Sequence, residues 1–358
     1  MINYFLNKTL YAILTLFGVV TVIFFLFNVL PGDPAQMMMG QNEDSEQLAK
    51  VKAKYGFDKP VLMQYAYYIN DLSPLSFHSK NKEDYTYLGE NKYSATPLFS
   101  LGNTTTVIKF PYLRESFTKQ GKKVTQVLGE TLPNTFVLAV SAIIIAIILG
   151  ILLGIVSALY KDRWLDKTIQ IFSTLGMSVP SFFSAILFAW LFGYVLHEFT
   201  NLEMTGSLYE LDDFGEAMHI KWKNLILPAI VLGIRPLAVV IQLMRNSLLE
   251  VFNQDYIRTA RAKGLSEFQI IKRHAVKNAL NPVVTAISGW FASMLAGAVF
   301  VEFIFGWNGL GKEIVNALNT LDLPVIMGSV LVIATLFVMI NILVDLIYVW
   351  LDPKVKLH

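Results

Sequence analysis

The fold of this chain is decided by residues 255–282, which read DYIRTARAKGLSEFQIIKRHAVKNALNP. This charged segment separates two apolar runs, and from Asp255 to Lys277 it holds six lysines and arginines against two acids. The pattern predicts two short helices joined at a bend, a compact basic shape suited to docking beside a membrane. The alternative is an interfacial helix pair without a partner, its basic side chains facing lipid headgroups.

The bend is expected at Gly264, because glycine readily adopts the left-handed backbone that ends a helix. A first helix is expected over Asn253–Lys263, which is rich in helix-forming residues. Ser266 is expected to cap the second helix, with Gln269 at the third position of a capping box.

The second helix is expected to have one apolar face, formed by Phe268, Ile271 and Ala275. The basic residues lying largely off this face are Lys272, Arg273 and Lys277.

The composition is that of a membrane protein with several spans. Of 358 residues, 54% are hydrophobic and 16% are charged, which lies outside the usual range of soluble proteins. The net charge of +2 is too small to indicate a nucleic-acid partner. Because the chain has no cysteine, a disulfide framework, a thiolate metal site and a cysteine nucleophile are excluded.

Six membrane-spanning helices are expected, since open strands cannot satisfy their backbone hydrogen bonds in lipid and each run is about long enough to cross some 30 Å of hydrocarbon. The uncharged runs are Leu10–Leu30, Leu132–Tyr160, Thr168–Leu196, Asn278–Val301 and Pro324–Val344, and a sixth run, Asn224–Met244, contains one arginine. A cleaved signal peptide is the alternative for the first run. That run is too long for one, and Pro31-Gly32-Asp33-Pro34 makes a poor cleavage site.

The basic residues of the short connections predict that both termini and the 255–277 loop are cytoplasmic. The inside set is Lys8, Lys161, Arg163, Lys167, Arg245, Arg258, Arg261, Lys263, Lys272, Arg273, Lys277, Lys354 and Lys356. The outside set is Lys221, Lys223 and Lys312.

Three regions are expected along the chain. They are the first transmembrane helix (1–30), an extracytoplasmic accessory subdomain (31–130), and a five-helix transmembrane core (131–358) with a cytoplasmic coupling loop over 250–280. A structureless loop as long as the second region is unexpected, so we predict a small α/β or mixed subdomain there. Glu46–Lys54 and Val61–Leu72 are expected to be helical, and Leu98–Gln126 to hold a hairpin.

Arg258-Thr259-Ala260, three further residues and then Gly264 resemble the cytoplasmic coupling loop of ABC-importer permeases, the EAA loop. The wider run Asp255–Leu265 is close to the form found in the dipeptide, oligopeptide and nickel branch. The general loop has Glu-Ala-Ala where this chain has Arg-Thr-Ala, and ends in Ile-x-Leu-Pro where this chain has His274-Ala275-Val276-Lys277; both departures are normal for the peptide branch. Further matches are Pro31-Gly32-Asp33-Pro34, Tyr55-Gly56-Phe57-Asp58-Lys59-Pro60 and Gln64-Tyr65, whereas Ser73 to about Thr105 is additional to the short family form.

The resemblance implies an all-α polytopic protein with the six-helix fold of type I ABC importer permeases, in a bacterial inner membrane. The implied partners are a paralogous permease subunit, two ATPase subunits that carry ATP and Mg²⁺, and an extracytoplasmic substrate-binding protein, with no nucleic acid. The chain is then a transport subunit without catalytic residues, bound metal or cofactor of its own. The residues implied in ATPase coupling are Asp255, Arg258, Thr259, Ala260, Lys263, Gly264, Leu265, Arg273 and His274.

Within this set, Thr259, Ala260 and Leu265 are expected to pack tightly against the ATPase. Arg258, Lys263 and Arg273 are expected to supply the charge complementarity that sets specificity and register.

Residues 306–312, Gly-Trp-Asn-Gly-Leu-Gly-Lys, match the phosphate-loop pattern G-x-x-x-x-G-K. Glu313 follows in place of the Ser or Thr that holds magnesium, no strand precedes the motif, and the expected topology places it outside. We expect instead a turn followed by a short re-entrant or lateral helix, Leu310–Leu318. The run Val301–Gly311 also resembles the outer gate segment of peptide permeases. The candidate gate residues are Glu302, Trp307, Gly309 and Gly311.

Arg235 is the one basic residue deep in a span, near the midplane, where a charge costs about 3 kcal/mol or more. Pro236 follows it and is expected to kink the helix. Two hypotheses are open. Arg235 lines a water-filled pathway and meets substrate carboxylates such as a peptide C-terminus, or it pairs with a carboxylate such as Glu302, Asp345 or one on a partner subunit.

Pro180 and Ser181, at a proline kink in the third span, are further pathway candidates, although packing is the commoner reason for such kinks. Asp345 and Asp352-Pro353-Lys354 are interpreted as an interfacial anchor and helix stop. The five histidines show no metal-binding spacing.

The function expected is that of the membrane subunit of an ATP-driven importer of dipeptides or oligopeptides. Closure of the ATPases would move the 255–277 loop as a lever and turn the permease from inward- to outward-facing. The sequence shows no metal-ligand cluster, which favours peptide over nickel; glutathione and oligosaccharides stay open as alternatives within the branch. A channel or an intramembrane enzyme is the alternative from another class, but no selectivity ring or paired catalytic groups are visible.

Overall fold

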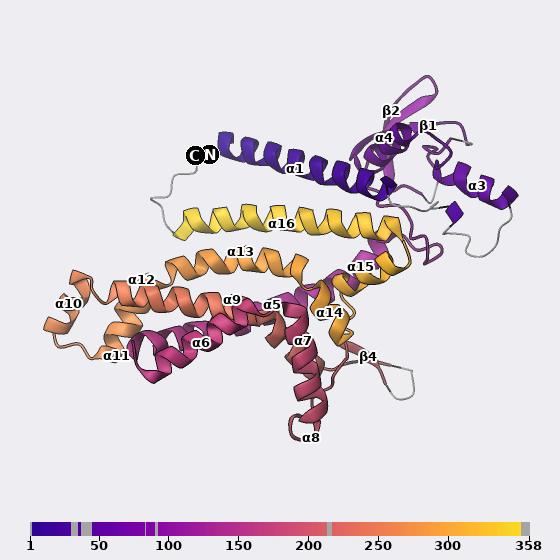
Figure 1. The fold of residues 1–358 in the computed structure, drawn as a ribbon. Coiled ribbons are helices and arrows are strands. Elements are labelled where there is room, and N and C mark those ends of the chain that lie inside the picture. Colours follow the sequence, from indigo (N-terminus) through magenta and orange to yellow (C-terminus); the bar gives the residue numbers. More distant parts are fainter. Residues whose placement is uncertain are drawn as a thin grey trace. The chain divides into compact units, whose positions relative to one another are not determined.

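The computed structural model describes residues 2–29, 35–36, 45–82, 84–89, 92–212 and 217–351 (Figure 1). The segments Pro31–Pro34 and Asp352–Lys354, named above, lie outside the described residues. The chain forms two compact units. The core unit comprises Met1–Lys8, Thr131–Glu313 and Thr335–His358, and the accessory unit comprises Thr9–Glu130 and Ile314–Ala334.

The core unit is mostly helical in the part of the chain that the structure describes. Its helices are α5 (Val124–Leu159, from Thr131 onward), α6 (Trp164–Ser178), α7 (Ser181–Trp190), α8 (His197–Thr200), α9 (Lys223–Val251), α10 (Asp255–Ala262), α11 (Glu267–Ile270), α12 (Val276–Ala279), α13 (Asn281–Gly297), α14 (Val299–Phe305) and the start of α15 (Leu310–Asn319). Two π-helical turns, Leu191–Val195 and Ile271–Ala275, follow α7 and α11. One antiparallel hairpin pairs β4 (Tyr209–Leu211) with β5 (Met218–Ile220).

Helix α9 lies at the centre of the core unit, with α6, α7, α12, α13 and α14 packed against it. Val231, in the first half of α9, belongs to one apolar cluster. Met244 and Leu248, in the last half of α9, belong to another. Helix α5 also approaches α9 closely, since a side-chain carbon on Gly233 would lie 2.9 Å from the carbonyl oxygen of Ala142. Such small-residue contacts are typical of helices packed in a membrane.

Four helices are long and apolar enough to cross a membrane, namely α5, α9, Asn7–Asn28 of α1 (Ile2–Val29) and Leu323–Asp345 of α16 (Leu323–Leu351). Two further pairs reach that length only as bent pairs, so the described residues contain up to six spans. The first pair, α6 with Ser181–Val195, is bent by 111°, and the second, Glu267–Leu295 with α14, by 56°. The runs expected as the third and fifth spans are therefore each divided into two helices.

The break between α6 and α7 follows from Pro180. Proline lacks an N–H and disfavours helical backbone in the residue before it, and Val179 is accordingly extended, with a ψ of 131°. The expected kink in the third span is thus a complete change of helix direction. By contrast, α9 continues as one helix through both Pro228 and Pro236, so Pro236 does not end it.

The accessory unit combines helices with a small sheet. It contains α1 from Thr9 onward, α3 (Ser45–Tyr55), α4 (Val61–Leu72), β1 (Leu75–Ser79), β2 (Ala95–Leu101), β3 (Thr104–Lys109) and the first part of α16. The sheet is antiparallel in the order β1-β3-β2. The helices expected over Glu46–Lys54 and Val61–Leu72 are confirmed. The expected hairpin is β2–β3, which begins three residues earlier than predicted.

A buried carboxylate organises the accessory unit. Asp71, at the end of α4, is 0% exposed and accepts hydrogen bonds from the hydroxyls of Tyr85 (2.6 Å) and Tyr93 (3.0 Å) and from Arg114 Nε (3.0 Å). Burial raises the pKa of both tyrosines, which keeps their hydroxyls as donors. Asp71 thereby ties α4 to three segments that are distant in sequence.

Candidate coupling elbow and translocation cavity

The elbow, defined here as residues 251–280, has the bend that its sequence predicts (Figure 1). Gly264 has a φ of +79°, in the left-handed region that favours glycine, and no heavy atom would crowd a side chain there. The backbone angle, and not lack of space, therefore requires glycine. The capping box is also confirmed: the N–H of Gln269 donates to Ser266 Oγ (3.4 Å), and the N–H of Ser266 donates to Gln269 Oε1 (3.2 Å).

Buried apolar side chains anchor the elbow to α9. Those in one cluster with Met244 and Leu248 of α9 are Ile257, Ala260, Ile270, Ala275 and Ala279. Leu265, which is half-buried, packs against the same cluster. Ala260 and Leu265 thus have packing contacts within this chain, and the tight packing against an ATPase expected of them stays a prediction.

Phe268 contradicts the apolar face expected for the second helix. Its side chain is 70% exposed, and Ile270 is buried in its place. The physical reason is the π-helical turn over Ile271–Ala275, which adds a residue to one turn and shifts the face that precedes it. Phe268 is thus part of the exposed surface of the elbow.

The exposed surface of the elbow is basic with two aromatic side chains. The coupling candidates that are exposed are Asp255, Arg258, Thr259, Lys263, Gly264 and Arg273, and His274 is half-buried. The Arg258 side chain is 73% exposed, and its Nη1 lies 3.7 Å from Asp255 Oδ1. Tyr256 is 42% exposed and lies on the same elbow as Phe268.

Arg235 lines a cavity of about 90 Å³ together with Ser181, Ser184 and Trp290. Its Nη2 donates to the carbonyl oxygen of Val179 at 3.4 Å, at the C-terminal end of α6. Because carbonyl groups at a helix C-terminus carry partial negative charge, the proline break supplies a partner for the guanidinium. Within the described residues, the buried Nε of Arg235 has no hydrogen-bond partner.

Neither carboxylate considered as a structural partner of Arg235 pairs with it. Glu302 Oε2 accepts from the N–H groups of Gly311 (2.6 Å) and Lys312 (3.2 Å), and Asp345 forms an ion pair with Lys8. The guanidinium of Arg235 therefore keeps donor capacity that no carboxylate in the described part of the chain uses.

The four gate candidates form one tightly packed turn. Glu302 is 0% exposed, and its carboxylate lies at the N-terminus of α15, where free N–H groups and the helix dipole stabilise an anion. A side-chain carbon on Gly309 would lie 2.4 Å from Glu302 Oε2, and one on Gly311 would lie 2.4 Å from Val299 Cα. The position of Gly311 therefore requires glycine, and a side chain in place of Gly309 would displace the Glu302 carboxylate.

Trp307 ties this turn to α5. It is 0% exposed, and its Nε1 donates to the carbonyl oxygen of Asn134 at 3.0 Å, while Asn134 Nδ2 donates to the carbonyl oxygen of Asn308 at 2.7 Å. Helix α14, and not a strand, precedes Gly306, which agrees with rejecting a phosphate loop. The short helix expected over Leu310–Leu318 is confirmed as α15.

Comparison of the sequence with known protein families shows the family of this chain. Residues 150–357 match a family described as "Binding-protein-dependent transport system inner membrane component", and residues 1–90 match the corresponding N-terminal family. The chain belongs to this permease family. The dipeptide transport system permease protein DppB of Alkalihalophilus pseudofirmus is 32% identical over 369 residues, covering 99% of this chain and 100% of that protein. DppB of Bacillus subtilis is 32% identical over 358 residues, covering 100% of this chain and 99% of that protein.

Among solved structures, the MetNI methionine ABC transporter in inward-facing conformations is 16% identical with a TM-score of 0.49, covering 64% of this chain and 97% of that chain. As a member of the inner-membrane component family, the chain is a multi-pass transport subunit.

One anchor of this permease was missed from the sequence. Asp166, 2% exposed, accepts from Arg245 Nε (2.8 Å) and Nη2 (2.7 Å), from Ser157 Oγ (2.5 Å) and from the N–H of Asp162 (2.9 Å). This two-point ion pair joins α6 to α9. In the sequence, Arg245 is recognisable only as one of the basic residues expected on the cytoplasmic side. Asp166 lies two residues before the uncharged run Thr168–Leu196. No sequence pattern links the two residues, so their pairing could not be predicted.

Helix α9 connects the elbow of this permease to the cavity. Arg235 and Met244 are nine residues apart, which is about 14 Å along a helix axis, and Met244 packs against the buried side chains of the elbow. The elbow and Arg235 are therefore connected through packed side chains and one continuous helix, α9.

Proposed function

We propose that this permease is the transmembrane subunit of an ATP-driven importer of dipeptides or oligopeptides. The observation that carries the proposal is the exposed basic elbow anchored on α9. Similarity over the full length to relatives named as dipeptide transport permeases supports the substrate class.

The elbow is cytoplasmic in this proposal, with both chain termini on the same side, and it docks into a groove of a separate ATPase subunit that binds ATP and Mg²⁺. Arg258, Lys263 and Arg273 offer positive charge, which mainly sets specificity and register. Tyr256 and Phe268 offer aromatic surface, which contributes much of the energy at the centre of an interface. Because the elbow is packed on α9, movement of the ATPase groove is transmitted to α9.

Arg235 binds the carboxylate of the substrate during translocation. Its Nε lacks a partner within the described residues, and its guanidinium lines a cavity with the hydroxyl-bearing Ser181 and Ser184. A charge-assisted hydrogen bond to a carboxylate is the strong interaction available to such a group. The C-terminal carboxylate is the anion that unmodified peptides share, whatever their side chains.

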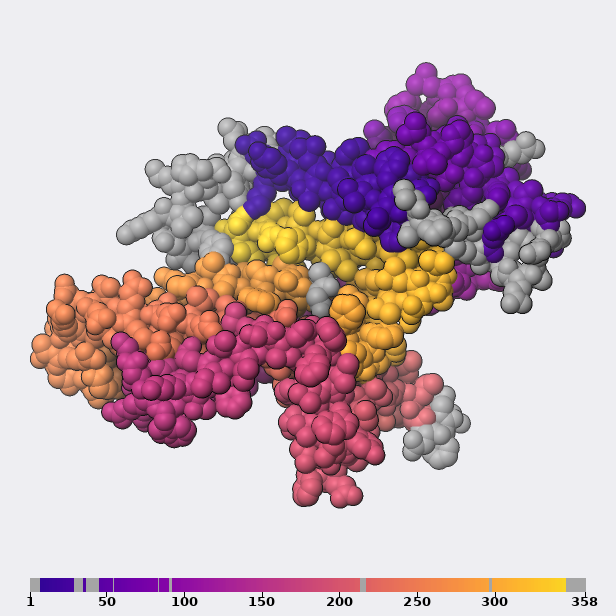
Figure 2. All heavy atoms as spheres, viewed as in Figure 1, coloured from indigo at the N-terminus to yellow at the C-terminus, as the bar shows by residue number. Residues whose placement is uncertain are grey.

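A second, similar permease subunit is the proposed neighbour of α7 and α8. These helices form an arm that stands out from α6 and α9 (Figure 2). The arm carries exposed apolar side chains, among them Phe182, Phe183, Ile186, Trp190 and Phe199, the last 87% exposed. An apolar surface of this extent marks contact with a membrane or another protein. A substrate-binding protein delivers the peptide on the extracytoplasmic side, near the Glu302–Gly311 turn that acts as the outer gate.

The test is uptake by the complete transporter reconstituted into liposomes, with peptides that have a free or an amidated C-terminus. We expect Arg235→Gln to lower uptake of the free peptide roughly tenfold, the loss of one charge-assisted hydrogen bond, and to abolish the preference over the amidated form. Arg163→Gln is the matched control, because Arg163 is an exposed arginine just before α6. This variant should leave both the uptake of the free peptide and the preference over the amidated peptide unchanged.

An unchanged preference for the free peptide in Arg235→Gln contradicts the role of Arg235. Uptake of nickel, glutathione or oligosaccharides in place of peptide contradicts the substrate class.

A further inference from the structure

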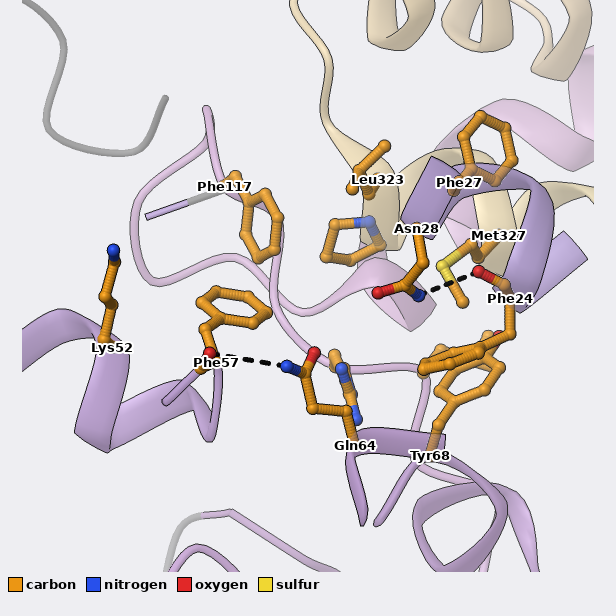
Figure 3. A pocket seen from close by; sticks show the side chains of 13 residues that line it. Phe24, Phe27, Asn28, Lys52, Phe57, Gln64, Tyr68, Phe117, Leu323 and Met327 are labelled. Carbon is orange, nitrogen blue, oxygen red and sulfur yellow. Dashed lines mark hydrogen bonds between the residues drawn. The ribbon is translucent and has the colours of Figure 1, made fainter. Parts of the chain in front are cut away.

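A second cavity, of about 320 Å³, lies within the accessory unit (Figure 3). Pockets of this size and larger hold small ligands. Aromatic side chains dominate one part of its wall, including Phe24, Phe57 and Phe117, and Met327 adds a flexible apolar surface. The proposed transport function makes no use of this cavity.

The cavity lies at the ends of two membrane spans. Phe24, Phe27 and Asn28 are the last turn of the Asn7–Asn28 span, and Leu323 and Met327 are in the first turns of the Leu323–Asp345 span. The rest of the wall comes from α3, α4, the connection between them and the segment after β3, none of which is a candidate span. In a bilayer crossed by these two spans, the cavity would therefore lie where the hydrocarbon meets the headgroup layer.

The polar part of the wall is cationic. Lys52 and Arg114 line the cavity, and among the described residues of its wall none is acidic. Arg114 donates from Nε to Asp71 (3.0 Å), and within the described residues its two terminal nitrogens donate no further hydrogen bond. An anionic group in the cavity would meet one arginine with unused donors and one lysine.

Two amide side chains provide acceptors beside these cations. Asn28 Nδ2 donates to the carbonyl oxygen of Phe24 (2.8 Å), and Gln64 Nε2 donates to the carbonyl oxygens of Phe57 (3.3 Å) and Lys59 (2.9 Å). Their oxygens accept no hydrogen bond from any described residue, and Figure 3 shows both amides directed toward the space between the aromatic rings. Hydroxyl groups of a ligand would satisfy these oxygens.

We propose that this cavity binds one anionic phospholipid with a hydroxyl-bearing headgroup. The phosphate lies toward Arg114 and Lys52, headgroup hydroxyls donate to Asn28 and Gln64, and the first methylenes of an acyl chain pack against Phe24 and Met327. Apolar side chains, two cations and two amide acceptors thus line one cavity, as the chain, phosphate and hydroxyls of such a lipid require. An apolar residue of the peptide cargo is the competing occupant, and the test separates the two.

The test is native mass spectrometry of the purified full chain in detergent, titrated with phosphatidylglycerol or with phosphatidylcholine. We expect one phosphatidylglycerol to bind roughly tenfold more tightly than phosphatidylcholine, since each nearby basic residue favours an anionic lipid. Lys52→Glu should remove most of this preference. Lys50→Glu is the matched control, because Lys50 is on the same helix, is 72% exposed and does not line the cavity.

A second variant fills the cavity without changing charge. Leu323→Trp should lower binding of both lipids, and a phosphatidylglycerol carrying a photoreactive group on its first acyl carbons should label Phe24–Asn28 or Leu323–Met327 in the wild type. Equal binding of the two lipids, equal effects of Lys52→Glu and Lys50→Glu, or labelling confined to other segments would overturn the proposal. Displacement of the lipid by an apolar tripeptide would also overturn it, in favour of a peptide subsite. None of these readouts depends on uptake, so failure here leaves the proposed transport function standing.

Discussion

Gly264 is the residue on which the geometry of the elbow depends. It sits between α10 and α11 with a left-handed backbone, and the space around it is open. For most other residues that backbone costs about 1–2 kcal/mol, and asparagine is among the few that adopt it readily. The elbow therefore offers a substitution that changes conformation without a steric clash.

We predict that Gly264→Val abolishes ATP-dependent uptake while the permease still inserts into the membrane at normal levels. Gly264→Asn should keep most of the uptake, because asparagine tolerates the left-handed region. Uptake by liposomes and the amount of membrane-inserted protein are measured together. Full uptake by the valine variant would contradict a role for the bend in coupling.

Individual residues were predictable where their partners are close in sequence. The capping box of Ser266 and Gln269 depends on neighbours three residues apart, and it was predicted correctly. Phe268 was misplaced because a π-helical turn interrupts the regular helical period. The partner of Arg235 could not be predicted either, since the carbonyl of Val179 becomes available only where α6 ends against α9.

At the scale of helices, the Asp166–Arg245 pair holds α6 against α9. The Asp166 side chain is 3% exposed and that of Arg245 is 18% exposed. Removing one partner of a buried pair leaves an uncompensated charge and costs about 3–5 kcal/mol. The exposed pair Arg261–Glu267, with side chains 45% and 62% exposed, is worth about 0–1 kcal/mol at most.

We predict that Asp166→Asn lowers the free energy of unfolding by about 3 kcal/mol, whereas Glu267→Gln changes it by less than about 1 kcal/mol. Denaturant unfolding of the purified permease in one detergent measures both variants against the wild type. The two pairs differ chiefly in burial, so equal shifts for the two variants would count against the anchoring role of Asp166.

The stability of the sheet in the accessory unit is expected to depend on pH through His78 on β1. His78 is 0% exposed; its Nδ1 contacts the carbonyl oxygen of Thr86 (2.8 Å) and its Nε2 the hydroxyl of Ser76 (2.9 Å). Burial lowers the pKa of His78 below its ordinary value of 6.5, and the nearby charges of Lys109 and Lys92 also lower it. The hydrogen bond to Thr86 and the charge of Asp71 raise the pKa, but by less. Below pH 6.5 the unfolded chain therefore takes up the proton more readily than the folded one, and stability falls as the pH falls.

We predict that hydrogen-exchange protection factors of β1 and β3 amides fall between pH 7 and pH 5. His78→Gln should reduce this dependence, while His219→Gln, on the exposed strand β5, should keep it. Protection factors that are flat over this range in the wild type would show that His78 does not titrate in the unfolding equilibrium.

At the scale of the molecule, the core unit carries the proposed coupling device. The elbow is packed on the last half of α9, and Arg235 lies near its middle. The long apolar runs predicted which segments are helical and apolar enough to span a membrane, because length and hydropathy decide that. They did not predict the 111° and 56° bends, because a bend depends on which neighbours satisfy the freed backbone groups.

The central claim is that the elbow contacts a separate ATPase. The chain contains no cysteine, so Arg258→Cys places a single thiol on the exposed surface of the elbow. The decisive measurement is cross-linking of this thiol, in membranes that contain the complete transporter. We expect a cross-link between this thiol and the ATPase subunit, with a yield that changes when ATP is added. A thiol that reacts with membrane-impermeant reagents from outside intact cells, and forms no cross-link to the ATPase, would contradict it.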